Sequence, residues 1–383
     1  MRFISKAAAV LLAAVISTVF CTANIAWATE IPDISARAAI VINAETGEVL
    51  FRKNADKHLP MASTTKIMST ILAIEHGRLD EQFTVDPQAV KTEGSSMGLR
   101  ENDKVTLRAL CYGMMLPSGN DAANCTAVRV AGSIEGFVGL MNEKAKSLGL
   151  KDTHFVTPSG LDDYTDEHYS TALDMAKLTR YAMKNQVFRE ICSAKKVKLC
   201  YGDPPYDRWL TNTNKLLSTC RGAIGVKTGF TDKAGRCLVS CCERNGAQLI
   251  CVTLGDRNDW QDHSMLYDHC FAFVSRQTLS AGSGYFELNV VGSDRDSIRC
   301  HAEPVKACLL NGRAKDVKTI VRLPRFVYST VRKGDVVGSA EFWYNGELIA
   351  KSDICAMTDA EYVKAECKGF LENIKSKLVG LFG

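Results

Sequence analysis

The pattern of apolar residues changes along the chain, and each pattern predicts a different kind of structure. Residues 38–43 are rich in Ile and Val, and a Glu-Thr-Gly turn at 45–47 leads into a second short run at 48–51. Two such runs around a turn predict a β-hairpin at the edge of a sheet.

Helical spacing dominates the following region. Apolar residues recur at intervals of three and four from Ser63 until Gly77, which predicts a helix that ends at the glycine. The same periodicity predicts further helices over residues 107–115, 121–130, 134–147 and 172–184. Thr171 and Asp174 have the spacing of a capping box at the start of the last of these.

Strand signals then replace helical ones. Runs at 236–243 and 247–254 are joined by Asn245-Gly246, a strong hairpin turn signal, and a helix is predicted over about 259–275. Beyond about residue 279 only short β-rich runs recur, and we expect a small all-β domain. These runs are residues 285–291, 307–310, 319–323, 337–344 and 347–350.

The last residues return to a helical pattern. Between Cys367 and Phe382 the apolar residues fall on one face of a helix, and lysines and a glutamate occupy the other. Two interpretations are open: a terminal helix packed on the β domain, or an amphipathic helix lying in a membrane interface. The bulky end at Leu381-Phe382 favours the membrane.

The first 28 residues have the pattern of a secretory signal. Arg2 and Lys6 precede an apolar stretch at 7–20, and Ala26-Trp-Ala28 supplies small residues for cleavage. The alternative is an uncleaved anchor, but the apolar stretch is short for a membrane span. We expect an exported protein at the outer face of the cytoplasmic membrane.

Composition adds two constraints. A length of 383 residues suggests two domains, and a net charge of +4 gives no support for nucleic-acid binding. The chain has fifteen cysteines, many of them inside apolar runs such as residues 237–242. There they resemble small hydrophobic residues, so we hypothesise mostly free thiols.

Candidate chemistry begins with Ser63 and Lys66, which share one face of a predicted helix. A serine hydroxyl needs a base to become a nucleophile, and a lysine amine can act as one when burial or a nearby positive charge lowers its pKa. The backbone N–H of Ser63, near a helix start, could help to bind an oxyanion. Taken alone, the pair reads more simply as a helix cap and a solvated lysine.

Two later motifs complete this chemistry. In Ser118-Gly-Asn120, Ser118 could relay a proton and Asn120 could donate to a substrate carbonyl, although the tripeptide also reads as a plain turn. Lys227-Thr-Gly229 follows an apolar run and reads as an edge strand on which an extended peptide could lie. Lys227 and Thr228 could bind a substrate carboxylate, and Gly229 leaves room for the peptide.

Together these segments resemble the serine-type D-alanyl-D-alanine carboxypeptidases, the low-molecular-mass penicillin-binding proteins. The resemblance covers nearly all of the chain after the signal, and further matching segments carry it. They are Pro60-Met-Ala-Ser-Thr-Thr-Lys66, Ser118-Gly-Asn-Asp121, Thr157-Pro-Ser-Gly-Leu161, His168-Tyr-Ser-Thr-Ala172, Val226-Lys-Thr-Gly-Phe-Thr231 and residues 331–338.

The resemblance implies an α/β (α+β) transpeptidase domain of the penicillin-binding and β-lactamase type, with an antiparallel sheet flanked by helices. A C-terminal β-sandwich-like domain and a terminal amphipathic helix would follow. We place the signal at 1–28, the catalytic domain at 29–277, the β domain at 279–360 and the membrane-associating helix at 361–383.

The resemblance also implies roles for individual residues. Ser63 would be the nucleophile, Lys66 the base and Ser118 the proton relay. Substrate contacts would come from Asn120, Lys227, Thr228 and Gly229. The oxyanion hole would use the backbone N–H groups of Ser63 and Phe230; relatives often have His where this chain has Phe230. Some relatives place an Arg near the substrate carboxylate, but Arg257 in residues 256–260 does not align clearly with it.

The expected activity is removal of the terminal D-alanine from peptidoglycan stem peptides that end in D-Ala-D-Ala, through an acyl-enzyme on Ser63. β-Lactam antibiotics would acylate the same serine. A serine β-lactamase is the nearest alternative, but no Glu-x-x-x-Asn follows Asn120 at a convincing position. A transpeptidase or endopeptidase with the same acyl-enzyme stays open, and the intact motifs argue against an inactive wall-binding protein.

No cofactor or metal is expected. The seven histidines include no His-x-x-x-His pair, and His263 and His269 fit core or surface roles better than metal ligation.

Overall fold

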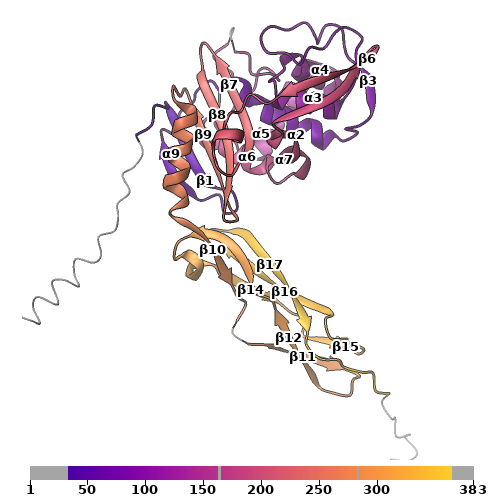
Figure 1. Ribbon diagram of the computed structural model, residues 1–383. Helices are drawn as coiled ribbons and strands as arrows, with labels where there is room; N and C mark the ends of the chain where they lie inside the picture. The colour runs from indigo at the N-terminus through magenta and orange to yellow at the C-terminus, as the bar shows by residue number, and fades with distance from the viewer. Residues whose placement is uncertain (1–32, 163–164, 283, 365–383) are drawn as a thin grey trace, which may run out of the picture. The chain divides into compact units, whose positions relative to one another are not determined.

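The computed structural model describes residues 33–162, 165–282 and 284–364. Its N-terminal part is built on a five-stranded antiparallel sheet with the strand order β2-β1-β9-β8-β7 (Figure 1). The strands are β1 (Ala38–Asn43), β2 (Val49–Lys53), β7 (Ala223–Thr231), β8 (Gly235–Arg244) and β9 (Ala247–Leu254). The predicted hairpin is confirmed, with β2 at one edge, and the Lys-Thr-Gly strand β7 forms the other edge.

Helices cover both faces of this sheet (Figure 1). Helix α9 packs against β8 and β9 on one face, and α6 packs against β1 and β9 on the other, where α2 lies next to α6. The helical elements are η1 (Ala62–Thr65), α2 (Lys66–His76), α3 (Leu107–Met115), α4 (Asn120–Ala131), α5 (Ile134–Ser147), α6 (Ala172–Ala182), α7 (Gln186–Ser193), α8 (Leu216–Thr219) and α9 (Asp259–Phe271). This is the flanked antiparallel sheet that the resemblance implied.

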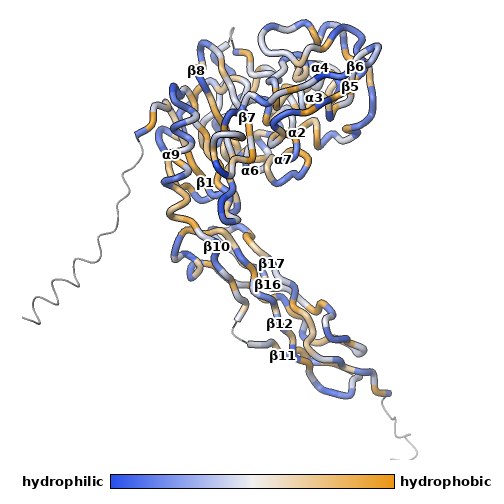
Figure 2. Tube along the Cα trace, viewed as in Figure 1, coloured by the Kyte–Doolittle hydropathy of each residue, from blue (hydrophilic) through white to orange (hydrophobic). Residues whose placement is uncertain are grey.

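The core of this part lies between the sheet and the helices. Alternate residues of β1, β8 and β9 are buried there, as are the apolar faces of α2, α3 and α6. Figure 2 shows the corresponding contrast between hydrophobic stretches inside the fold and hydrophilic loops at its periphery. The apolar periodicity of the sequence therefore predicted these elements well, and α3 and α5 have the predicted bounds.

Helix α9 is shorter than predicted. It ends at Phe271, and Val274–Leu279 instead forms strand β10, which pairs antiparallel with β13 (Val305–Leu310). Strand pairing with residues 26 to 36 positions further along the chain overrides the local helical spacing, and no short window of sequence contains both partners.

The capping box is only half formed. Thr171 Oγ1 accepts a hydrogen bond from the backbone N–H of Asp174 at 3.0 Å, as an N-cap should. The Asp174 carboxylate accepts instead from the backbone N–H of Asp152 at 2.8 Å and from Thr153 Oγ1 at 3.1 Å. It therefore ties a neighbouring loop to the start of α6 rather than closing the box.

Sequence patterns did not predict α7 or the β5–β6 hairpin, formed by Lys196–Gly202 and Pro205–Thr211. A two-stranded sheet of β3 (Gln82–Thr84) and β4 (Lys104–Thr106) was also not predicted. These strands are short or largely exposed, so their apolar alternation is weak.

Within residues 274–282 and 284–364, the C-terminal part is all β except for one short turn, η2 (Arg313–Asp316), as predicted. A six-stranded sheet has the order β14-β16-β17-β12-β11-β15, and β10 and β13 form a second, two-stranded sheet. The six strands are β11 (Phe286–Val291), β12 (Ser297–Ala302), β14 (Lys318–Arg322), β15 (Phe326–Tyr328), β16 (Val336–Tyr344) and β17 (Glu347–Ala356). Their inward side chains make a hydrophobic cluster of their own, which includes Leu288, Phe342 and Ile354.

The predicted signal at 1–28 and nearly all of the predicted tail helix at 361–383 lie outside the described residues. Within the described ranges, no helix is long and apolar enough to cross a membrane. The thirteen cysteines of these ranges are free thiols, as hypothesised, and eleven of them are buried.

Candidate active site

Ser63 lies in the 3₁₀ turn η1, directly before α2, rather than at a simple helix cap. The preceding Ala62 has a φ of 49°, in the left-handed region that a residue with a side chain rarely occupies. Gly160 packs directly against the backbone of this turn. A Cβ on Gly160 would lie only 2.0 Å from the carbonyl oxygen of Ala62. The Pro-Ser-Gly-Leu segment thus packs against the backbone that presents Ser63.

Lys66 is fully buried one turn further along, and its ammonium group has three hydrogen-bond acceptors. Its Nζ lies 2.8 Å from Ser63 Oγ, 2.7 Å from Asn120 Oδ1 and 2.7 Å from the carbonyl oxygen of Ser159. An ammonium group has three donors, so these contacts account for all of them. Burial lowers the pKa of Lys66 well below its ordinary value, and the positive charge of Lys227 lowers it further.

The Ser118-Gly-Asn120 motif forms a tight turn before α4, where Ser118 has a φ of 67°. The Ser118 side chain lines the same pocket as Ser63. Asn120 is buried: its Nδ2 donates to the carbonyl oxygen of Glu93 at 2.7 Å, while its Oδ1 accepts from Lys66. An amide nitrogen carries two N–H groups, so the contact with Glu93 uses one of them.

Asp121, the residue after this motif, joins the start of α4 to a neighbouring loop through hydrogen bonds. Its buried carboxylate accepts from the backbone N–H groups of Met97, Gly98 and Leu99 at 2.9, 3.1 and 3.0 Å. These bonds hold the 96–99 loop, which directly follows the pocket residue Ser95, against the start of α4.

Strand β7 closes the other side of the site. Gly229 lies against η1, since a Cβ there would be 3.1 Å from the Ser63 nitrogen. Lys227 is buried and its Nζ donates to the Thr228 carbonyl oxygen at 2.8 Å. Burial lowers the pKa of Lys227 to about 7. The hydroxyl groups of Thr228 and Thr213 share a hydrogen bond of 2.7 Å. Phe230, the next residue but one on β7, is 63% exposed.

These elements surround one open pocket of about 500 Å³. The pocket is lined by serine and threonine hydroxyls, by one arginine and one aspartate, and by two aromatic side chains. The lining residues are Ser63, Ser95, Ser118, Thr213, Thr228, Gly229, Phe230, Arg236, Asp259 and Trp260. The structure therefore brings Ser63, Ser118, Thr228, Gly229 and Phe230 together at the pocket and places Lys66, Asn120 and Lys227 buried beside it.

Sequence reasoning missed several groups that shape the site. The carbonyl oxygens of Ser159 and Pro158 accept from Lys66 and from Ser69 in α2, the latter at 2.6 Å. The segments that contain Pro158, Ser159 and His168 were noticed only as parts of a resemblance. A backbone carbonyl leaves no trace in residue type, so no sequence signal could have assigned it this contact.

His168 is buried and supports the η1 turn that contains Ser63. Its Nδ1 accepts from the Val156 N–H at 2.9 Å, so the proton belongs on Nε2, which lies 2.8 Å from Thr65 Oγ1. Burial lowers the pKa of His168 to about 4, which keeps the ring neutral at physiological pH. The neutral ring thus joins the His-Tyr-Ser-Thr-Ala segment to the residue next to Lys66.

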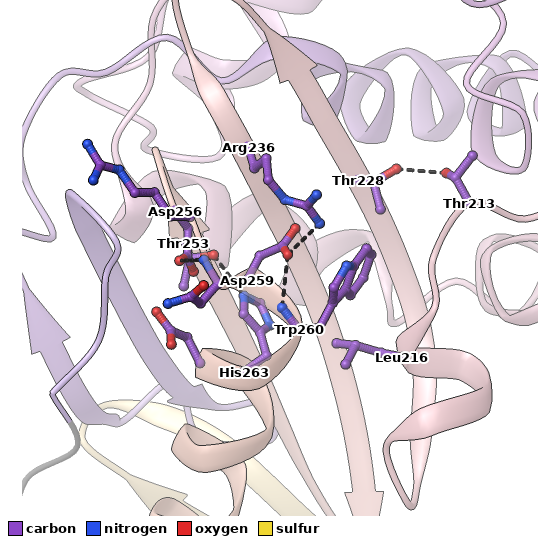
Figure 3. Close-up of polar contacts among 12 residues, drawn as sticks. Thr213, Leu216, Thr228, Arg236, Thr253, Asp256, Asp259, Trp260 and His263 are labelled. Carbon is purple, nitrogen blue, oxygen red and sulfur yellow. Dashed lines mark hydrogen bonds and ion pairs between the residues drawn. The ribbon is translucent and has the colours of Figure 1, made fainter.

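Arg257 does not line the pocket around Ser63. It lines a neighbouring surface depression together with Arg37 and Asp232, and this depression shares Phe230 and Arg236 with the Ser63 pocket. The arginine that lines the Ser63 pocket is Arg236 on β8, a residue that sequence analysis did not single out. Nearby, His263 is buried and bonded to Ser240 at 2.6 Å, the core role expected for it. It is also bonded to Thr253 at 3.0 Å (Figure 3).

Comparison with known proteins agrees with this geometry. Residues 25–258 match the family model described as D-alanyl-D-alanine carboxypeptidase, and residues 273–362 match that of the penicillin-binding protein 5 C-terminal domain. The D-alanyl-D-alanine carboxypeptidase DacF of Bacillus subtilis is 30% identical over 336 residues, which are 85% of each chain.

Two solved structures are also similar. Penicillin-binding protein 5 of Haemophilus influenzae has 27% identity and a TM-score of 0.62, with 87% of this chain and 99% of that one covered. A mutant of the Streptomyces K15 DD-transpeptidase has 34% identity and a TM-score of 0.60, with 63% of this chain and all of that one covered.

The chain therefore belongs to the serine-type D-alanyl-D-alanine carboxypeptidases, hydrolases of the penicillin-binding class. The resemblance read from its motifs is confirmed along both parts of the fold.

Proposed function

We propose that this protein removes the terminal D-alanine from peptidoglycan pentapeptides through an acyl-enzyme on Ser63. The observation that carries the proposal is the 2.8 Å contact between Lys66 Nζ and Ser63 Oγ, with Lys66 buried and its pKa lowered. A neutral Lys66 amine can accept the hydroxyl proton as Ser63 attacks the carbonyl of the penultimate D-alanine.

The remaining steps use the other pocket residues. The backbone N–H groups of Ser63 and Phe230 stabilise the oxyanion of the tetrahedral intermediate. Its collapse breaks the amide C–N bond, and Ser118 passes the proton held by Lys66 to the departing nitrogen of D-alanine. Water then attacks the ester, giving the shortened peptide and free Ser63.

Substrate contacts are proposed for four residues. The peptide lies extended along the free edge of β7, where Gly229 leaves room for it. Thr228 binds the carboxylate side of the substrate, and Lys227 contributes positive charge from beneath the strand. Asn120 donates its second N–H to a substrate carbonyl while its oxygen holds Lys66.

The direct test is incubation with a diacyl-L-Lys-D-Ala-D-Ala peptide, with free D-alanine measured. We expect release by the wild-type enzyme and none by Ser63→Ala. A β-lactamase would instead turn over a chromogenic cephalosporin steadily, whereas we expect a burst of one equivalent and slow release. Steady rapid turnover would contradict the proposal.

A DD-transpeptidase is the second candidate, favoured by the likeness to the Streptomyces K15 DD-transpeptidase. Both activities share the acyl-enzyme and differ in whether water or an amine accepts the acyl group. Adding glycine as an acceptor to the peptide assay separates them, because a transpeptidase accumulates the glycine adduct at the expense of the hydrolysed peptide.

We further propose the domain bounds 1–28, 29–277, 279–360 and 361–383 for the signal, the catalytic domain, the β domain and a membrane-associating tail. Support comes from the N-terminal signal pattern and from the apolar face of the tail sequence. The protein would then work outside the cytoplasm, peripherally bound to the membrane. Deleting residues 370–383 should move it from the membrane fraction to the soluble fraction, and unchanged membrane association would refute the tail.

A further inference from the structure

The pocket around Ser63 has one conspicuous charged group, the guanidinium of Arg236. Among the described residues that line the pocket, Arg236 is the one cation and Asp259 the one anion. The lysines of the motifs are not lining residues: Lys66 and Lys227 are 0% and 1% exposed. Lys227 Nζ also donates to the Thr228 carbonyl oxygen, and its pKa of about 7 leaves it only partly charged at neutral pH.

Strand register places Arg236 beside the substrate strand. Arg236 on β8 lies directly opposite Phe230 on β7, two residues beyond Thr228. Alternate residues of a strand, and directly opposite residues of a pair, point to the same face, so Thr228, Phe230 and Arg236 share one face of the sheet. A peptide bound along the edge of β7 therefore has the Arg236 side chain next to it.

Helix α9 holds the guanidinium in place. Arg236 Nη2 donates to Asp259 Oδ1 at 2.6 Å, and the guanidinium carbon lies 5.4 Å from the centre of the Trp260 ring. Asp259 is itself fixed, because its side chain is 4% exposed and the same Oδ1 accepts from the Trp260 N–H at 2.9 Å. Figure 3 shows Arg236 directed toward Asp259, with Trp260 beside them.

This arrangement leaves most of the guanidinium available. A guanidinium has five N–H donors, and the bond to Asp259 uses one. The Arg236 side chain is 43% exposed, so its other donors can reach the pocket. A carboxylate can accept two parallel bonds from such a group, which gives both strength and direction.

We propose that Arg236, positioned by Asp259 and Trp260, binds the terminal carboxylate of the substrate. This inference rests on the proposed function, since it assigns the carboxylate of the leaving D-alanine to that side of the pocket. The same contact would bind the carboxylate of a β-lactam.

The test compares substrates that differ only in that carboxylate. One is the diacyl-L-Lys-D-Ala-D-Ala peptide, and the other is the same peptide with a C-terminal carboxamide. We expect Arg236→Gln to lower kcat/KM for the acid by about 10- to 100-fold, the range for losing a hydrogen bond to a charged group. For the carboxamide, Arg236→Gln and the wild-type enzyme should agree within about threefold. Arg236→Lys should recover part of the loss, because it restores the charge but not the planar fork.

The chain offers a matched control on the same strand. Arg244 on β8 also bonds an α9 carboxylate, Asp268, at 2.5 Å and also lies near an α9 aromatic ring, Phe271, at 5.0 Å. Arg244 is not a lining residue of the Ser63 pocket. Arg244→Gln should therefore reproduce any purely structural effect while leaving the acid-to-carboxamide ratio unchanged.

An equal loss on both substrates, or the same ratio change in Arg244→Gln, would overturn the assignment. If the wild-type enzyme released neither D-alanine from the acid nor D-alaninamide from the carboxamide, the proposed function would fail instead. The role of Arg236 as a carboxylate-binding residue would then be tested by acylating the enzyme with benzylpenicillin and with its methyl ester. Mass spectrometry would monitor both reactions. If Arg236→Gln slows acylation by benzylpenicillin but not by its methyl ester, the proposed role of Arg236 is supported. If it slows acylation by both compounds equally, that role is refuted.

Discussion

Lys66 Nζ lies 2.8 Å from Ser63 Oγ, and the lysine is held there by Asn120 and by the Ser159 carbonyl. The contact joins a weak nucleophile to a buried amine whose charged form is disfavoured. Each partner alone would be an ordinary residue of a helix start.

Ser63→Ala should abolish covalent labelling by fluorescent penicillin, because no hydroxyl remains to form the ester. The measurement is gel fluorescence after denaturation, which only a covalent adduct survives. Ser147→Ala is a suitable control, since Ser147 is exposed at the end of α5 and bonds only locally to Lys144. Labelling that persists in Ser63→Ala would disprove the nucleophile.

The acylation rate should rise with pH through the lowered pKa of Lys66, because the neutral amine is the active form. The positive charge of Lys227 contributes to that lowering. Lys227→Met should therefore move the acid limb of the rate profile to higher pH, in addition to reducing the rate. The profile is measured with saturating penicillin in stopped flow. If the acid limb of the rate profile stayed unchanged or moved to lower pH in Lys227→Met, the proposed effect of the Lys227 charge on the pKa of Lys66 would be contradicted.

Lys227 also makes stability depend on pH. Its pKa is about 7 in the folded chain, below the ordinary value of 10.5, so the unfolded chain binds more protons between these values. The free energy of unfolding therefore gains from this group as pH rises, by at most about 1.4 kcal/mol per pH unit.

Lys227→Met removes this dependence. The variant should gain stability over the wild-type protein at pH 6.5, and the gain should shrink by pH 8.5. Urea unfolding at both values measures the difference, in which the contributions of other groups cancel. A gain that stays constant or grows with pH would show that the folded pKa of Lys227 is not lowered.

Gly160→Ala should destabilise the protein by roughly 3 kcal/mol and slow penicillin labelling. Its φ of 88° is strained for alanine, and the new Cβ would lie 2.0 Å from the Ala62 carbonyl oxygen. Gly139→Ala is the control: it lies inside α5 with open space around it and should stabilise by about 0.5–1 kcal/mol. Similar effects of the two variants would refute the role of Gly160.

Thiol titration of the denatured, unreduced protein should detect at least the thirteen cysteines that the structure describes as free. Most of them fill buried positions where a small apolar side chain is needed. A count near zero would indicate disulfides and would contradict the structure. Reduced protein provides the reference count.

Local patterns in the sequence predicted much of this molecule. Helical spacing and a stop at Gly77 predicted α2, and Asn245-Gly246 between two apolar runs predicted the β8–β9 hairpin. These predictions succeeded because each depends on residues that are close in the chain. The three motifs predict a candidate site from equally local information, since each supplies a residue type with a known chemical use.

Tertiary structure decided the rest. The pairing of Phe230 with Arg236 brings an arginine to the pocket that Ser63 lines, and the pairing of β10 with β13 ends α9 early. The acceptor for Lys66 at Ser159 is a backbone carbonyl, which any residue could supply. The sequence by itself thus determined which reactive groups the protein has. Only long-range packing decided which backbone and side-chain groups surround them, because register and carbonyl direction depend on partners far apart in the chain.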